Sequence, residues 1–337
     1  MFAFLLRRFN LMLSTLFIIS LIGFSLGHLF PGDPVENYSG IKEFTYSEYI
    51  ALTEAYKVDE NLVVQYWAYI QRTFSGDLGL SLNSQTPVLD EIKQVLPATV
   101  ELSVYALLIA IFIGIPLGIL AGIKHKKPTD NVLYSFSIVA NSIPIFWLGL
   151  LFILFLSLNF KLLPMSGRHH LLYEIPNITG FVLLDTLLLQ ADYKWLALKD
   201  AMSHLILPTL TLAMVPITLF LTITRSSVIQ VMQTSYVKAA KTKGLSNWKL
   251  IRKHILRNAL LPVLPQIALT LNTLMTSAMI TEVIFSWPGI GNWLIEAIYQ
   301  RDYPAIQAGL IVVATFVMFM HIIVDVLHTV LNPLIRK

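Results

Sequence analysis

The chain has 337 residues, of which 55% are hydrophobic and 13% are charged, and its mean hydropathy is +0.68. Soluble domains carry about 25% charged residues, so this composition predicts that most of the protein lies in lipid. The chain has no cysteine, which excludes disulfides, zinc–thiolate sites and thiol catalysis, and its formal net charge of +4 is small enough that the distribution of charge matters more than the total.

Six segments are long and apolar enough to cross a bilayer, which takes about 20 helical residues. The first is too long for a signal-peptide core and has no cleavage site of the A-x-A kind, so we interpret it as a retained anchor. The sequence therefore predicts an all-α, multi-pass membrane protein with six transmembrane helices. The six segments are approximately 9–30, 102–123, 132–160, 205–224, 259–285 and 306–330.

Basic residues predict the orientation of these spans. With the N-terminus inside, the cytoplasmic pieces are 1–8, 124–131, 225–258 and 331–337. These pieces hold 15 of the 24 Lys and Arg residues but only one acid, Asp130, out of 20 acids in the chain. Short loops rich in Lys and Arg stay on the cytoplasmic side of a membrane. We therefore expect both termini to lie inside.

The first outside loop, 31–97, is long enough to form structure of its own, between the first span (1–30) and a five-helix core (98–337). Thr45 and Glu48 form a capping-box pattern that opens a predicted amphipathic helix at about 46–55. A second amphipathic helix is expected at about 62–74. It carries three aromatic residues, Tyr66, Trp67 and Tyr69. These aromatics favour equally a position in the membrane interface and a role in docking a partner.

The second outside loop, 161–204, contains an apolar stretch at 181–189 that is too short to span a bilayer and includes Asp185. We expect a re-entrant or interfacial helix there.

The loop 225–258 is the most informative part of the chain, because it holds eight Lys and Arg residues and no acid. Its residue types predict a helix over 235–243, a break at Gly244, which tolerates positive φ, and a second helix capped by Ser246 and running to Asn258. Such a helical pair predicts a docking element for a soluble partner. A basic loop held by anionic headgroups is the alternative, and the small residues of the pair count against it.

This loop resembles the EAA loop of ABC-transporter import permeases, and most closely that of the dipeptide and oligopeptide branch. The resemblance rests on YVKAAKTKG at 236–244 and HILRNALLP at 254–262. Lys238 stands where a Glu is usual, and His254 fits the peptide branch. The other matching motifs are PGDP at 31–34, GDLG at 76–79, LPAT at 96–99, IPLG at 115–118, SIPIFW at 142–147, FSWPGIG at 285–291, RDYP at 301–304 and NP at 332–333.

The resemblance implies a type I ABC importer permease fold in a bacterial inner membrane, with an extracytoplasmic helical loop and a cytoplasmic coupling helix. It also implies as partners a second related permease, two ATP-binding subunits and a periplasmic substrate-binding protein, besides membrane lipid, and no nucleic acid. The chain has no G-x-x-x-x-G-K-[ST] loop, so ATP and Mg are expected on the partner subunits, and no catalytic role is expected here. The residues expected to couple to the ATP-binding subunits are Ala239, Ala240, Lys241, Lys243, Gly244, Leu245 and Lys249.

Within the branch, LPMSGR at 163–168 and TGFVLLD at 179–185 resemble the B subunits of Sap-type peptide-transport permeases. That resemblance implies a peptide cargo, with cationic antimicrobial peptides as one class. A small cationic cargo such as a polyamine, moved in either direction, is the alternative.

Polar residues within the spans are candidates for the transport pathway, although small polar residues also hold helix pairs together. The candidates are Asn141, Ser142, Asn272, Thr273, Thr276, Ser277 and Glu282. For Glu282, attraction of a cationic cargo and capping of the fifth span are equal alternatives. Pro144 and five other prolines predict kinked or broken spans. No histidine–cysteine metal spacing appears.

Two other classes of function remain as alternatives. His321, Asp325 and His328 share a helix face and would suit a self-sufficient proton-coupled carrier, although an ion-paired patch near the cytoplasmic end of the sixth span is favoured. An intramembrane enzyme is not supported, because the chain contains no nucleophile elbow of the G-x-S-x-G type.

Overall fold

The computed structural model describes the backbone of residues 2–331, and the side chains of that range apart from 2–8, 247, 324, 325 and 327–331. Within this range the regular structure is helical throughout, as the sequence predicts, and the only pairing of extended backbone is one bridge between Leu80 and Pro87. The described chain forms two compact units, and each is described separately below.

Five helices are long and apolar enough to cross a membrane, and a sixth candidate is a bent pair. The apolar part of each single helix matches a predicted span. The helices α5 and α9 continue beyond this apolar part into polar sequence. These five are α1 (Phe2–Leu29), α5 (Val88–Ile123), α9 (Lys194–Gln233), α13 (Val263–Phe285) and α15 (Tyr303–Leu331).

The third predicted span, 132–160, is not one continuous helix. Its first part is α6 (Pro128–Ser142), and its second part comprises α7 (Ile145–Phe152) and the π-helical segment η1 (Ile153–Asn159), bent by 102° from the first. Pro144 lies in the break. Because proline disfavours helical geometry in the residue before it, Ile143 is extended, with φ −84° and ψ 123°.

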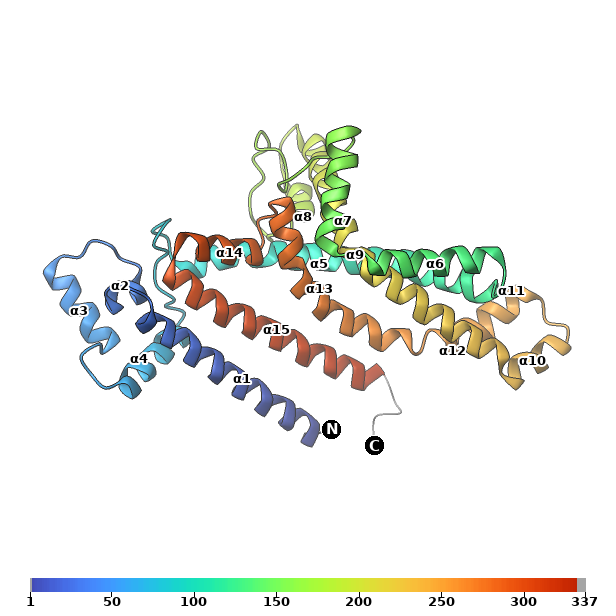
Figure 1. Cartoon of the computed structure of the whole chain (residues 1–337), viewed down its shortest axis with the longest axis horizontal. Coiled ribbons are helices and arrows are strands. Elements are labelled where there is room, and N and C mark those ends of the chain that lie inside the picture. The colour runs from blue at the N-terminus through green and yellow to red at the C-terminus, as the bar shows by residue number, and fades with distance from the viewer. Residues whose placement is uncertain (1, 332–337) are drawn as a thin grey trace. The chain divides into compact units, whose positions relative to one another are not determined.

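The first unit contains α1, the start of α5, most of α15, and the helices of the first loop and of residues 290–300 (Figure 1). The predicted loop helices are confirmed as α3 (Tyr46–Tyr56) and α4 (Leu62–Phe74), and the capping box between Thr45 and Glu48 is present. The remaining helices of this unit are α2 (Pro34–Ser39) and α14 (Ile290–Gln300).

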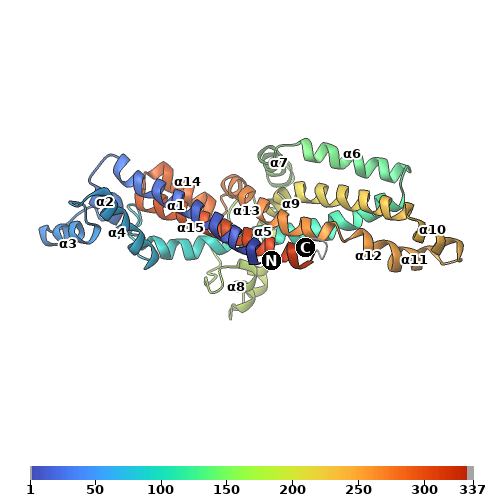
Figure 2. The same ribbon diagram turned by 90° about the horizontal axis from the view of Figure 1, so that it is seen from below.

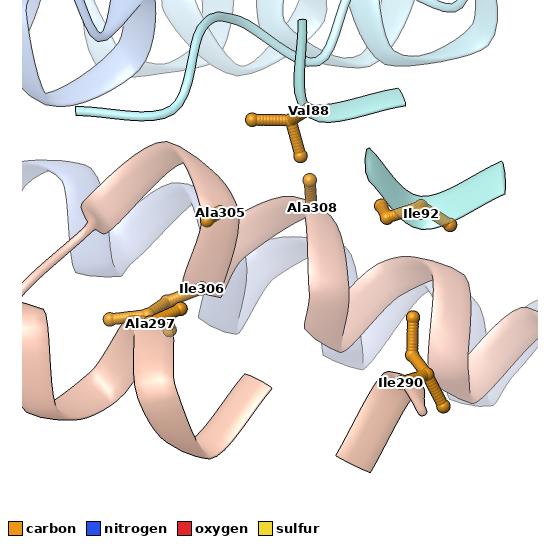
Figure 3. Packing of buried hydrophobic residues seen from close by; sticks show 7 residues of the cluster. All are labelled: Val88, Ile92, Ile290, Ala297, Ala305, Ile306 and Ala308. Carbon is orange, nitrogen blue, oxygen red and sulfur yellow. The ribbon is translucent and has the colours of Figure 1, made fainter. Parts of the chain in front are cut away.

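A hydrophobic cluster joins the start of α5 to α14 and α15 in this unit (Figure 3). Val88 and Ile92 of α5 pack against Ile290 of α14 and Ile306 of α15. The nearby Asp302 carboxylate accepts a hydrogen bond from the Ser81 hydroxyl at 2.5 Å. Apolar burial and this polar contact together fix the first loop to the beginning of the last span.

The second unit is organised around α9, which packs against α6, α7, α13 and α8 (Val182–Leu188). The helix α8 confirms the short helix predicted in the second outside loop. Gly114 and Gly118 of α5 face α9, where a Cβ atom would lie 2.7 Å from the Ile217 carbonyl oxygen and 2.6 Å from that of Leu221. These two glycines form a G-x-x-x-G pattern, which allows the two helices to pack closely.

Candidate functional site

The basic loop folds as two short helical segments with a turn between them, as predicted. The first is α10 (Ser235–Thr242), and Gly244 in the turn has φ +79°. The second segment begins directly after Ser246 and runs through α11 (Asn247–Leu250), the π-helical η2 (Ile251–Ile255) and α12 (Leu256–Ala259). We refer to residues 235–259 as the coupling elbow; it lies at the end of α9 in both views (Figures 1 and 2).

A hydrophobic cluster of its own holds the coupling elbow together. Val237 of α10, Leu250 of α11 and Ile255 of η2 are buried with Val228 of α9. Full burial of each such side chain contributes about 1.5–3 kcal/mol. The Asn258 amide also donates a hydrogen bond to the Tyr236 hydroxyl at 2.6 Å, which joins the two segments directly. The coupling elbow is therefore a packed element and not a flexible tether.

One of the predicted coupling residues faces inward. Ala240 is only 8% exposed and belongs to the buried cluster, so its small side chain allows the two segments of this chain to pack closely. Its direct contact with a partner stays a prediction. The other predicted coupling residues are exposed: Ala239, Lys241, Lys243, Gly244, Leu245 and Lys249.

The exposed face of the coupling elbow also contains a tryptophan that the sequence analysis did not single out. Trp248 is 69% exposed, beside Leu245 at 36%. The signal was available, because tryptophan is rare in basic, solvated loops and is enriched at the energetic centres of protein interfaces. Around Gly244, a Cβ atom would meet no other atom within 4 Å, so this glycine is needed for its positive φ and not for packing within the chain.

A buried ion pair connects the α5–α6 turn to the end of α9, next to the coupling elbow. The Asp130 carboxylate is 1% exposed and accepts hydrogen bonds from Arg225 Nε at 2.5 Å and Nη2 at 3.0 Å. It also accepts from the Lys126 backbone at 3.0 Å, and His125 Nδ1 lies 3.0 Å away. The Arg225 guanidinium lies 4.6 Å from the Tyr134 ring centroid.

Sequence reasoning singled out Asp130 only as the one acid on the predicted cytoplasmic side. Its position as the single acid among basic residues could have indicated an ion pair, because a carboxylate there has basic side chains to pair with. The partner could not be identified, since Arg225 is 95 residues away in the chain.

The predicted pathway residues fall into exposed and buried groups. Asn141 and Ser142 are exposed at the break between α6 and α7, and Thr273 and Thr276 are exposed on α13, where their hydroxyls donate to carbonyls of their own helix. Ser277 is partly buried. The buried members are Asn272, 6% exposed, and Glu282, 0% exposed. Attraction of a cationic cargo and capping of the fifth span both stay predictions for Glu282.

A second buried ion pair lies in the second unit, where Arg168 donates to the Glu101 carboxylate. Glu101 is 0% exposed and also accepts a hydrogen bond from the Leu183 backbone at 3.3 Å, at the start of α8. Arg168 lies 5.5 Å from the Trp287 ring centroid. Glu101 therefore fixes the second outside loop onto α5.

The three residues predicted for proton coupling are only partly described. His321 is exposed, whereas the side chains of Asp325 and His328 lie outside the described residues, as does the NP motif at 332–333. Among the described side chains, no group of three or more His, Cys, Asp or Glu could hold a metal ion.

Several helices long and apolar enough to span a membrane define a multi-pass membrane protein, and an exposed, basic and internally packed elbow follows α9. Residues 114–337 match the family described as "Binding-protein-dependent transport system inner membrane component", and residues 1–103 match its N-terminal counterpart, "Binding-prot-dependent transport system membrane comp, N-term". The chain belongs to this family of inner-membrane permeases of ABC transporters.

Full-length relatives place the chain within the peptide branch of the family. The putrescine export system permease protein SapB of Escherichia coli K12 is 41% identical over 337 residues, covering 100% of this chain and 98% of the relative. The peptide transport system permease protein SapB of E. coli O157:H7 has the same identity and coverage. The dipeptide transport system permease protein DppB of E. coli K12 is 38% identical over 339 residues, covering 100% and 99%.

Among solved structures, an inward-facing MetNI methionine ABC transporter is similar with a TM-score of 0.49 and 15% identity, over 70% of this chain and 93% of that chain.

Proposed function

We propose that this chain is the pore-forming permease subunit of an ATP-driven peptide transporter, working with a second related permease, two ATP-binding subunits and a periplasmic substrate-binding protein. Family membership and the names of the full-length relatives support the proposal. The observation that carries the coupling role is the coupling elbow itself, which is internally packed and presents small, apolar and basic residues outward.

The connections of the coupling elbow suit the transmission of force. Thr234 ends α9 and also precedes α10, so no flexible linker separates them. At the other end, α12 stops at Ala259, and α13 begins at Val263. A push or pull on the elbow therefore acts on α9 and α13, and ATP-driven closure of the partner subunits would tilt these spans and alternate access to the pore.

The exposed face offers two kinds of contact to an ATP-binding subunit. Ala239, Gly244 and Leu245 allow close approach of a partner backbone, and Trp248 supplies a large apolar side chain for a pocket. Three lysines surround these residues and would pair with acids at the rim of the partner's cleft. The lysines are Lys241, Lys243 and Lys249. ATP and Mg would be bound by the partner subunits.

The Asp130–Arg225 pair links α9 to the α5–α6 turn, so the coupling elbow is connected to this turn as well as to α9 and α13. Because Arg225 lies near the end of α9 and Asp130 at the start of α6, movement of the coupling elbow would also reach the α5–α6 turn. We therefore expect α5 and α6 to move with α9 during transport.

A small cationic cargo is the second candidate, because one relative at 41% identity is named as a putrescine export permease. The two candidates differ in a direct assay. Membrane vesicles containing the assembled transporter would accumulate radiolabelled peptide or radiolabelled putrescine in an ATP-dependent manner, and the orientation of the vesicles would give the direction of transport.

The docking assignment is tested by co-purification of the ATP-binding subunits with variants of this chain. Ala239→Trp places bulk on the exposed face of α10 without disturbing the buried cluster, and we expect it to abolish co-purification. Ala55→Trp makes the same change at an exposed alanine of α3 and should retain the ATP-binding subunits. Retention of these subunits in normal amount by Ala239→Trp would contradict the assignment.

A further inference from the structure

The helix α4 in the first loop presents an exposed apolar stripe. Val63 is 77% exposed, Trp67 is 62% exposed and Phe74 is 87% exposed. At about 100° per residue, spacings of four and seven residues place these three side chains on one face of the helix. Solvated helices seldom carry three large apolar side chains on one exposed face, so this stripe requires an apolar environment.

The opposite flank of α4 is polar and faces the rest of the loop. The Gln65 amide donates to the carbonyl oxygens of Val58 and Glu60 at 2.8 and 2.7 Å. Arg72, the only charged residue of α4, pairs with Asp77 and lies 4.1 Å from the Tyr56 ring centroid. The apolar flank of α4 therefore bears no charge, and the single charge of the helix is neutralised on the other side.

A third face of α4 packs against the span α1. The Tyr66 hydroxyl lies 2.7 Å from the Ser20 hydroxyl, and the Tyr66 ring meets the Phe17 ring edge-on at 6.1 Å. Gly23 leaves room for the Tyr69 hydroxyl, because a Cβ atom there would lie 2.8 Å from it. The helix is thus held along the side of α1 and not beyond its end, as Figure 1 also shows.

The distance of the α4 contact from the membrane surface follows independently from two spans, α1 and α15. Ser20 lies nine residues before Leu29, the last residue of α1, which corresponds to about 14 Å at 1.5 Å per residue. Ile311, which packs against the same aromatic cluster, lies eight residues after Tyr303, the first residue of α15, or about 12 Å. The hydrocarbon core of a bilayer is about 30 Å thick, so the contact lies within one leaflet.

We infer that α4 lies in the membrane interface at the C-terminal end of α1, with Val63, Trp67 and Phe74 inserted among the acyl chains of that leaflet. The positive-inside orientation makes this the outer leaflet. The polar flank, with Arg72 and Gln65, then faces the water side together with α3. Interfacial helices take this arrangement, with the apolar face buried about 5–10 Å below the headgroups.

The natural absence of cysteine allows a direct test in the full-length chain, reconstituted in phosphatidylethanolamine and phosphatidylglycerol vesicles. Single cysteines at Val63 and Phe74 replace exposed side chains and leave the packing intact. Ala55→Cys on α3 is the matched control in water. Each cysteine carries a bimane fluorophore, which is quenched either by lipids with a nitroxide on the upper acyl chain or by aqueous iodide.

We expect lipid nitroxide to quench bimane at positions 63 and 74 severalfold more than at position 55, and iodide to show the reverse order. Quenching at positions 63 and 74 by iodide, as strong as at position 55, would overturn the inference. Protection of these positions only after a soluble binding protein is added would also overturn it, since it would identify the stripe as a protein-docking face. Neither outcome depends on the ATP-binding subunits, so the inference can fail while the proposed function stands.

Discussion

At the scale of single residues, the Asp130–Arg225 pair is a buried ion pair that joins α6 to α9 in the second unit. Both groups are largely withdrawn from solvent, and the carboxylate accepts two hydrogen bonds from the guanidinium and one from the backbone. Removing one partner of such a pair leaves the other buried without compensation, which is why the loss exceeds the value of the pair itself.

We therefore expect Asp130→Asn to destabilise the protein by about 3–5 kcal/mol, the usual effect of breaking a buried ion pair. Asp90→Asn is the control, because its ion pair with Lys93 is exposed and such pairs contribute roughly 0–1 kcal/mol. Thermal unfolding in detergent measures both. Arg225→Lys keeps the charge but loses the two-pronged contact, so its unfolding temperature should fall between those of the wild type and Asp130→Asn. Equal stability of Asp130→Asn and Asp90→Asn would contradict the role given to the pair.

Of the single-residue features, the turn at Gly244 follows from the sequence, whereas the orientation of Ala240 and the pairing of Asp130 do not. The turn at Gly244 was predictable, because a glycine between two helix-forming runs favours positive φ, and φ is +79°. The inward orientation of Ala240 was not, since a two-turn helix is too short for its apolar periodicity to distinguish its own core from a partner surface. Pairing of Asp130 with Arg225 depends on tertiary structure alone.

At the scale of elements, the sequence predicts where most helices lie, and its prolines predict that some spans are kinked or broken. Hydropathy finds the apolar segments, and the capping pattern at Thr45 locates the start of α3. The prolines predict kinked or broken spans, and Pro144 does lie at a break, whereas Pro208 and Pro216 remain inside α9. Both α9 prolines are buried, an environment in which prolines inside a membrane helix are tolerated and which the local sequence does not specify.

Close packing of α5 on α9 gives a prediction for the glycines. Gly118→Ala places a methyl group 2.6 Å from the Leu221 carbonyl oxygen, which is backbone and cannot move away. We expect a loss of about 1–3 kcal/mol, as for other overpacked sites. Thermal unfolding is compared with that of Leu120→Ala, an exposed position on the same helix. The packing role would be refuted by a Gly118→Ala variant that is as stable as the wild type.

The capping box of α3 gives a pH dependence. The Thr45 hydroxyl and backbone donate to the Glu48 carboxylate at 2.7 and 2.9 Å, and these bonds hold the pKa of Glu48 below its usual value. Because the pKa is lower in the folded state, the stabilisation is present above the unfolded pKa and is lost as the pH falls through the folded pKa. The first turn of α3 should therefore open in acid.

Amide hydrogen exchange, corrected for intrinsic rates, measures this opening. The start of α4 is an internal control, since its cap is the neutral Asn61 side chain, which accepts from the Val64 backbone at 3.1 Å. Acid should accelerate exchange in the first turn of α3 relative to α4, and Glu48→Gln should remove the pH dependence. A parallel response of the two helices would show that the cap does not depend on the carboxylate.

At the scale of the whole molecule, the chain combines the membrane helices of a permease with one internally packed loop, the coupling elbow. The family establishes an inner-membrane permease. The coupling elbow is continuous with α9 and is separated from α13 by a short turn. Movement of partner subunits would be transmitted through it to these two helices. The sequence could predict this element because its charge, its helix formers and its glycine all point to the same structure. The faces that line the pore could not be predicted, because they would depend on the second permease proposed as a partner.

The most direct measurement is cross-linking from the coupling elbow in the assembled transporter. A cysteine at Ala239, labelled with a photoactivated cross-linker, should capture an ATP-binding subunit, while the same label at Ala55 should not. The account predicts this product in inverted membrane vesicles, where the cytoplasmic face is accessible. Capture of the ATP-binding subunit from Ala55 and not from Ala239, or labelling of the cysteine at position 239 by an impermeant reagent from outside intact cells, would contradict it.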